Sequence, residues 1–140
     1  MAVNDLIGDS FTVLGTAKVS INSATTSNFD FGTPNDIDLR AESGYNPSDR
    51  ILVIFDASTA GTTDTVSFSV QDAADNAGSI GTPATAVTDG TLTGGTGDQY
   101  AITGVRLQPS RPWLRCRVTS DGATDTFVAQ VTVLAVPVGI

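Results

Sequence analysis

The sequence predicts an all-β fold, a jelly-roll β-sandwich of two antiparallel sheets with about eight strands. The chain has 140 residues, of which 20 are Thr and 12 are Ser, but only one is Lys and one is Glu. Residues that favour helices are therefore scarce, and β-branched and turn-forming residues dominate. Short segments of alternating apolar and polar residues recur between clusters of Gly, Pro, Asn and Asp, which is typical of a sandwich or barrel.

The alternating segments predict the strands in chain order. They cover residues 11–15, 17–21, 28–32, 36–40, 50–56, 64–72, 99–107, 113–119 and 125–136. In the segment 64–72, Val66, Phe68 and Val70 alternate with polar residues, so one face of this strand should be buried. The stretch 73–98 is rich in Gly and Thr and is predicted to hold one or two weak strands inside long surface loops. The length predicts a single domain over residues 1–140.

Two segments resemble each other at an offset of 61 residues. "ILVIFDASTAGTTDTVSFSV" and "LRCRVTSDGATDTFVAQV" both read as a strand, a loop that contains Gly, and a second strand opened by Asp-Thr. The offset aligns Gly61 with Gly122 and Asp64 with Asp125. One interpretation is two hairpins that use the same turn chemistry. The other is a pseudo-symmetric pair of hairpins, which a two-sheet jelly roll would supply.

Charge and cysteine content indicate where the protein works. A net charge of −8 disfavours nucleic acid and anionic membranes as partners, because both repel a negative surface. A lone Cys cannot form an internal disulfide. The first residues lack the basic region and apolar core of a secretory signal, and the apolar run "VLAVPVGI" is too short to span a bilayer. We expect a soluble protein made in a reducing cytoplasm.

The residue types disfavour catalysis, cofactors and metal binding. The chain has no His, which excludes His-based triads and His metal ligands. Its Asp residues sit at turn-like positions, where a carboxylate usually accepts from its own backbone. The Gly-rich segment 90–98 lacks the Lys of a phosphate-binding loop, and the segment 72–78 fails the spacing of an EF-hand. We expect no enzyme, no cofactor and no metal site, and a glycosidase with paired carboxylates is the weakest alternative.

The stretch "RLQPSRPWLRCRVTS", residues 106–120, gathers four of the seven basic residues, the single Trp and the single Cys. As a strand it should bury Leu114, Cys116 and Val118 on one face. The other side would then carry a strip suited to a protein interface, because Trp and Arg are enriched at interface hot spots. We call it the arginine strip, and its members are Arg111, Trp113, Arg115 and Arg117. Two alternatives remain: the Trp folds into the core, or the arginines pair with acids of the same chain.

The segment "LQPSRPWLRCRVTSDGATDTFVAQVTVLAV" resembles the C-terminal half of the jelly-roll cement proteins of tailed bacteriophage capsids. The segments "ATTSNFDFGT" and "DRILVIFDAS" are similar to earlier parts of that family, and 73–98 is the part least like it. The resemblance implies a decoration protein on the outside of a phage head, assembled in the bacterial cytoplasm. Such a protein bridges subunits of the major capsid protein as a homodimer or homotrimer and needs no cofactor.

The apolar end segments "MAVNDLI" and "VLAVPVGI" are a second candidate contact for such a role, because exposed apolar segments invite a covering partner. The alternative function is a lectin-like carbohydrate-binding or adhesion module, since jelly rolls serve many functions. That alternative needs exposed aromatic side chains, and the candidates are Trp113, Tyr45 and Tyr100.

Overall fold

A computed structural model describes most of the chain. The described residues are 11–22, 24–32, 35–46, 49–59, 61, 63–93, 97–105, 110–122 and 124–137. These residues form strands and no helix, so this part of the chain contains no helical membrane span. The end segment "MAVNDLI" and residues 138–140 of "VLAVPVGI", proposed above as contacts, lie outside the description, as do 106–109 with Arg106. Residues 133–136 of the second segment are instead part of a strand, in which Val133 and Ala135 are buried.

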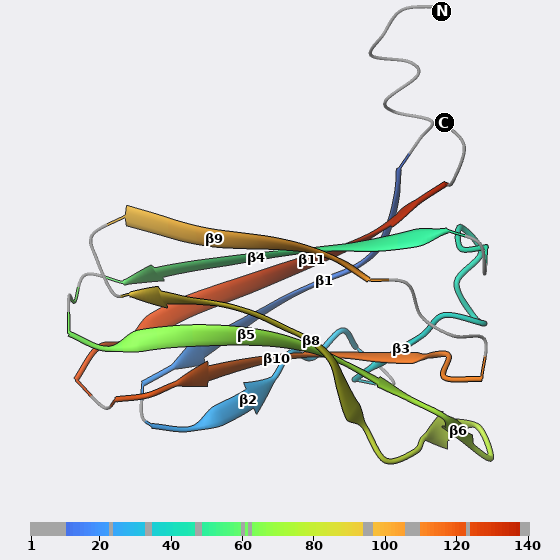
Figure 1. Ribbon diagram of the computed structural model, residues 1–140, viewed down its shortest axis with the longest axis horizontal. Coiled ribbons are helices and arrows are strands. Elements are labelled where there is room, and N and C mark those ends of the chain that lie inside the picture. The colour runs from blue at the N-terminus through green and yellow to red at the C-terminus, as the bar shows by residue number, and fades with distance from the viewer. Residues whose placement is uncertain are drawn as a thin grey trace, which may run out of the picture.

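Two antiparallel sheets pack face to face (Figure 1). The first has the order β1-β11-β4-β9, with β1 at Thr12–Ile21, β11 at Phe127–Val136, β4 at Arg50–Thr59 and β9 at Gly97–Val105. The second has the order β2-β10-β5-β8, and β3 also pairs with β10. Its strands are β2 (Thr26–Asn28), β10 (Trp113–Ser120), β5 (Thr65–Ala73), β8 (Ala84–Thr93) and β3 (Ile37–Asp38). A small hairpin joins β6 (Asp75–Asn76) to β7 (Ser79–Ile80).

The predicted alternation places the core between the sheets. Val66, Phe68 and Val70 of β5 are buried, as the sequence predicted, and so are alternate residues of β4, β10 and β11. The ring of Phe68 stacks on that of Phe55 from the opposite sheet, with 4.4 Å between the ring centroids. Burial of these side chains contributes roughly 1.5–3 kcal/mol each, so the alternating strands supply the main stabilisation of the sandwich.

Several of the predicted strand boundaries are wrong. The strand expected at 28–32 is Thr26–Asn28, and the one expected at 36–40 is only Ile37–Asp38. The two strands expected at 11–15 and 17–21 are one continuous strand, β1. Its register with β11 shifts between Val13 and Gly15, but the strand continues past this irregularity. The stretch 73–98 holds more than weak strands in loops, because β8 is a ten-residue strand paired to β5. The low apolar content of β8 fits its place at the edge of a sheet, where less side-chain burial is available.

The sequence repeat corresponds to two crossings between the sheets rather than to two hairpins. The chain leaves β4 in the four-stranded sheet and enters β5 in the five-stranded sheet, and β10 and β11 make the reverse crossing. The strand pairing obeys the same offset: Ser58 pairs with Val128, and Thr119 pairs with Ser67. The two units are related as the pseudo-symmetric interpretation expected, but hairpins were wrong in both interpretations, because each unit is an arch that crosses between the sheets. Both arches lie at one end of the sandwich (Figure 1).

The two arches hold each other through their aspartates. Asp125 Oδ2 accepts hydrogen bonds from the backbone amides of Thr63 and Asp64, at 2.8 and 2.9 Å. Asp64 Oδ2 accepts in return from the amides of Thr124 and Asp125, both at 2.7 Å. We call this reciprocal arrangement the clasp. Each carboxylate is 6% exposed, so the clasp satisfies four amides with little help from water.

Glycine is required at Gly61 and Gly122 for this close approach. A Cβ on Gly61 would stand 1.7 Å from Asp125 Oδ1, and one on Gly122 would stand 2.1 Å from Asp64 Oδ1. Both distances are far inside van der Waals contact. The aligned pairs of Gly and Asp in the sequence are thus one structural device used twice.

Candidate functional site

The arginine strip lies on and beside β10, but its tryptophan does not face solvent. Trp113 is 2% exposed, which contradicts the predicted outward position. It is the first residue of β10, where Asp38 of β3 flanks it on one side and Ala73 of β5 on the other. At this end of the strand the side chain is covered by neighbouring segments, so the alternation that holds further along β10 does not decide its burial.

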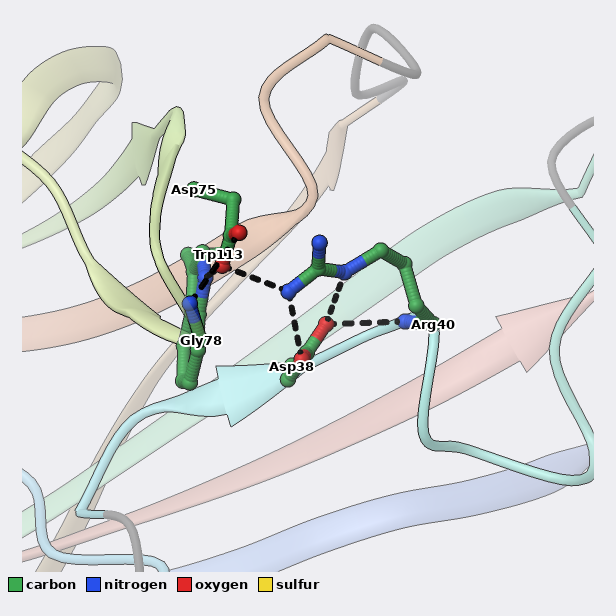
Figure 2. A network of polar contacts seen from close by, with 5 residues as sticks. All are labelled: Asp38, Arg40, Asp75, Gly78 and Trp113. Carbon is green, nitrogen blue, oxygen red and sulfur yellow. Dashed lines mark hydrogen bonds and ion pairs between the residues drawn. The ribbon is translucent and has the colours of Figure 1, made fainter.

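A network of hydrogen bonds around Asp75 surrounds the indole nitrogen of Trp113 (Figure 2). We call it the aspartate hub, and its members are Asp38, Arg40, Asp75, Gly78 and Trp113. Trp113 Nε1 donates to Asp75 Oδ1 at 2.9 Å, and Arg40 Nη2 donates to the same oxygen at 2.6 Å. Arg40 also forms a two-point contact with Asp38, and the amide of Gly78 donates to Asp75 Oδ2. The hydrogen bond from Arg40, followed by those from Trp113 and Gly78, lowers the pKa of Asp75 to about 2. The hub therefore fastens the β6–β7 hairpin to β3 and β10.

Two arginines of the strip are paired with acids of the same chain. Arg115 donates from Nε and Nη2 to the two oxygens of Asp36, both at 2.8 Å, a fork geometry that guanidinium and carboxylate groups favour. Arg111 donates from Nε to Asp72 Oδ1 at 2.7 Å and from Nη2 to the Asp72 carbonyl oxygen at 2.9 Å. Both residues thus serve internal pairing, which was one of the two alternatives left open by the sequence.

Arg117 is the arginine of the strip that the described residues do not engage in an ion pair. It is half-buried, on the outer face of β10, opposite Asn28 and Ser69. Its buried Nε has no hydrogen-bond partner among the described residues. Next to it, Cys116 is fully buried as predicted, and burial raises the pKa of its thiol well above the usual range. Among the described residues, Arg117 is thus the arginine of the strip that forms no ion pair.

The structure brings together a second surface, which the sequence analysis missed. Five aliphatic side chains lie on the outer face of the four-stranded sheet, and we call them the aliphatic face: Val13, Leu52, Ile54, Ile102 and Leu134. Val13, Leu134 and Leu52 form one row across β1, β11 and β4, and Ile54 pairs with Ile102 in the next row. Val13 is 61% exposed and Ile102 is 55% exposed. A contiguous exposed apolar patch of this kind marks an interaction surface.

A sequence signal for the aliphatic face existed in β4. The segment "ILVIF" is apolar at five consecutive positions, whereas a strand with one solvated face alternates. Residues Ile51, Val53 and Phe55 fill the core, so Leu52 and Ile54 must lie on the other face. The continuous apolar run indicates a strand that is covered on both faces. The described residues bury the inner face of β4 in the core and leave its outer face half-buried.

A pocket of about 170 Å³ lies between β1 and the segment that carries β3. It is lined by Leu14, Phe31, Asp36, Ile37, Asp38, Ala41 and Glu42. The described residues contain no group of three or more His, Cys, Asp or Glu side chains placed to hold a metal ion. The three acids of the pocket lie beside its four apolar lining residues, so the lining is mixed in polarity.

Comparison with known proteins supports the fold and leaves the family open. No protein-family model and no curated protein matches the chain. Among solved structures, the CBM22-1 xylan-binding domain of Paenibacillus barcinonensis Xyn10C matches with a TM-score of 0.57 and 8% identity, covering 93% of this chain and 98% of that one. The N-terminal cellulose-binding domain of Cellulomonas fimi β-1,4-glucanase C matches with a TM-score of 0.49 and 10% identity, covering 90% and 81%.

A capsid structure is also among the structural neighbours. The structure of infectious bursal disease virus, Gx strain, matches with a TM-score of 0.47 and 10% identity, over 92% of this chain and 32% of the viral chain. At these identities the likenesses concern the fold alone. The likeness to the xylan-binding domain, with its TM-score of 0.57, and the two antiparallel sheets of this chain confirm the all-β jelly-roll sandwich predicted from the sequence.

Proposed function

We propose that this chain is a structural capsid cement protein that binds the outside of a phage head and bridges neighbouring major capsid subunits. The observation that carries the proposal is the aliphatic face, whose exposed and half-buried apolar side chains are available to another protein. The sequence resemblance to jelly-roll cement proteins, carried by residues 107–136, supports the same function. On this proposal the protein resides on the exterior of the virion and acts as a homo-oligomer.

The physical logic of the proposal is repetition of weak contacts on a rigid body. A sandwich whose arches are clasped and whose loops are fastened by ion pairs presents a fixed surface, so little conformational entropy is lost on docking. Many copies on one shell then give avidity without a strong individual site. Arg117 is the member of the arginine strip that we propose for contact with a partner, because Arg111 and Arg115 are engaged within the chain.

A carbohydrate-binding module is the alternative, and the fold is shared with the xylan-binding domain described above. Binding of sugar rings relies on exposed aromatic faces. Trp113 is buried, Tyr45 is half-buried against the core, and the side chain of Tyr100 lies outside the description. Among the described aromatic side chains, Phe11 is the one with substantial exposure, at 42%. The described surface therefore favours a protein partner over a glycan.

The test is binding to heads of the encoding phage prepared without this chain. We expect saturable co-sedimentation of the wild-type protein, and at least a tenfold loss of affinity in Ile102→Glu, because a charge would be buried in an apolar contact. Ser79→Glu, which adds the same charge on the exposed β6–β7 hairpin, should bind as the wild type does. Absence of binding to heads, together with binding to xylan or another glycan, would overturn the proposal in favour of the alternative.

A further inference from the structure

The pocket beside β3 is preformed by backbone turns. Its wall segment is held by the hydrogen bond from the Ala41 amide to the Asp38 carbonyl oxygen and by the bond from the Tyr45 amide to the Glu42 carbonyl oxygen. On the opposite wall, the irregular register between Val13 and Gly15 turns Leu14 inward, where it is 8% exposed. The pocket therefore does not need to be opened by a ligand.

Gly15 shapes the apolar side of this pocket. A Cβ at this position would stand 2.8 Å from Cδ1 of Phe31 and 3.1 Å from Cδ1 of Ile37. Glycine thus lets both side chains approach β1 and line the pocket. The result is an apolar wall of Leu14, Phe31, Ile37 and Ala41 that faces carboxylates.

The charges around the pocket leave one carboxylate without a counter-ion. Asp36 is neutralised by Arg115, and Asp38 is neutralised by Arg40. Glu42 is half-buried and has no ion pair with any basic side chain of the described residues. The pocket therefore combines an apolar wall with a single uncompensated negative charge.

We propose that this pocket receives one lysine side chain from a protein partner, with its alkyl stem on the apolar wall and its ammonium group on Glu42. Lysine matches both features, since its four-carbon stem packs on apolar surface and its head is a compact charge. The volume suffices, because an apolar cavity of ~150 Å³ holds a benzene molecule. The net charge of −8 favours the approach of a basic surface.

Leu14 of the pocket and Val13 of the aliphatic face are consecutive residues of β1 that lie on opposite sides of this strand. Because β1 is the edge strand of its sheet, a partner that uses both surfaces would have to reach around that edge. The identity of this partner as a capsid subunit rests on the proposed function, but the chemistry of the pocket does not.

The test is an NMR titration of the full chain with Nα-acetyl-lysine N-methylamide, with Nα-acetyl-norleucine N-methylamide as the uncharged probe of similar length. We expect saturable shifts of the amides of Ile37, Asp38, Ala41 and Glu42, and at least tenfold weaker binding of the norleucine probe. Glu42→Gln should weaken the lysine probe at least tenfold. Asp121→Asn, which removes the same charge near the opposite end of β10, should leave binding unchanged.

Ala41→Leu provides a second variant that fills the pocket and keeps every charge, and it should abolish the shifts. Equal binding of both probes, shifts at other residues, or unchanged binding in Glu42→Gln would each overturn the proposal. Head binding separates the two proposals. Heads that bind wild type, Glu42→Gln and Ala41→Leu equally would refute the lysine pocket and leave the cement function standing. If the pocket binds the lysine probe but the protein does not bind heads, the lysine pocket stands and the cement function is refuted.

Discussion

Replacing one aspartate of the clasp should destabilise the fold far more than replacing an exposed aspartate. In Asp125→Ala, the amides of Thr63 and Asp64 lose their shared acceptor. The carboxylate is 6% exposed, so water can replace it only in part. Asp64→Ala removes the acceptor of the two symmetry-related amides, and the two variants should therefore behave alike.

The magnitude follows from the two orphaned amides. A buried donor left without a partner costs about 1–3 kcal/mol, and hydrogen bonds to a charged acceptor lie toward the upper end. Partial access of water to the arch reduces this value, so we expect each Ala variant to lose about 2–4 kcal/mol of unfolding free energy. Asp125→Asn keeps an oxygen that can accept both bonds, and it should lose about half as much.

Urea denaturation followed by circular dichroism measures the effect. With a slope of about 2 kcal/mol/M, a loss of 2–4 kcal/mol moves the midpoint by about 1–2 M. Asp30→Ala is the matched control, because Asp30 is exposed and accepts one local amide, that of Gly32. Hydrogen exchange at the four clasp amides reports the same event locally, since only the two amides that lose their acceptor should exchange faster before global unfolding.

The glycines provide an independent check of the same reasoning. Gly122→Ala places a methyl group against the Asp64 carboxylate and should destabilise by more than 1 kcal/mol. Gly104→Ala is the control, because a Cβ there meets no atom within 4 Å. Loss of less than about 0.5 kcal/mol in both aspartate variants, the range of an ordinary surface substitution, would refute the clasp as a stabilising device.

Three further predictions concern the arginine strip and its neighbours. Arg115→Ala should lower the unfolding free energy measured in urea by about 2–3 kcal/mol, because it leaves the 7% exposed Asp36 without its partner. This is less than the roughly 3–5 kcal/mol of a fully buried pair, since the Arg115 side chain is 22% exposed. Arg117→Ala should cost under about 1 kcal/mol, and equal losses in the two variants would contradict the pairing of Arg115 with Asp36. The contribution of Asp75 to stability should be complete above about pH 4 and lost as the pH falls toward 2, because its folded pKa of about 2 lies below the ordinary value of 3.8. Thermal melts should show a shallower acid dependence in Asp75→Asn, and identical profiles would refute the assignment. Native Cys116 should resist a thiol reagent such as DTNB and react only on unfolding, because burial disfavours its thiolate; rapid labelling of the folded protein would contradict its core position.

The fold was predictable because its evidence is local. Alternation in β5 and β10 correctly identified the buried residues Val66, Phe68, Val70, Leu114, Cys116 and Val118, since a strand's pleat fixes which side chains share a face. It placed Trp113 wrongly. The offset of 61 residues identified two related units, but it predicted hairpins, whereas both units cross between the sheets. That crossing depends on which strands pair, and pairing is a property of the whole chain.

The site was less predictable because it depends on neighbours distant in sequence. Trp113 is covered by the hub around Asp75, and the pairing partner of Arg115 is Asp36, 79 residues away. No periodicity in residues 106–120 contains this information. The aliphatic face has a local sequence signal, the apolar run "ILVIF". Interpreting this signal requires knowing that the described residues leave the outer face of β4 partly exposed.

The clasp also has a kinetic consequence. Each aspartate accepts hydrogen bonds from amides of the other arch, about 60 residues away in the sequence. These hydrogen bonds therefore form only after distant parts of the chain have met. We expect these bonds to be absent from the folding transition state, with φ-values near zero at both aspartates. Loss of the clasp would then accelerate unfolding and leave the folding rate unchanged. Such late bonds would set the lifetime of the folded state rather than the speed at which it forms.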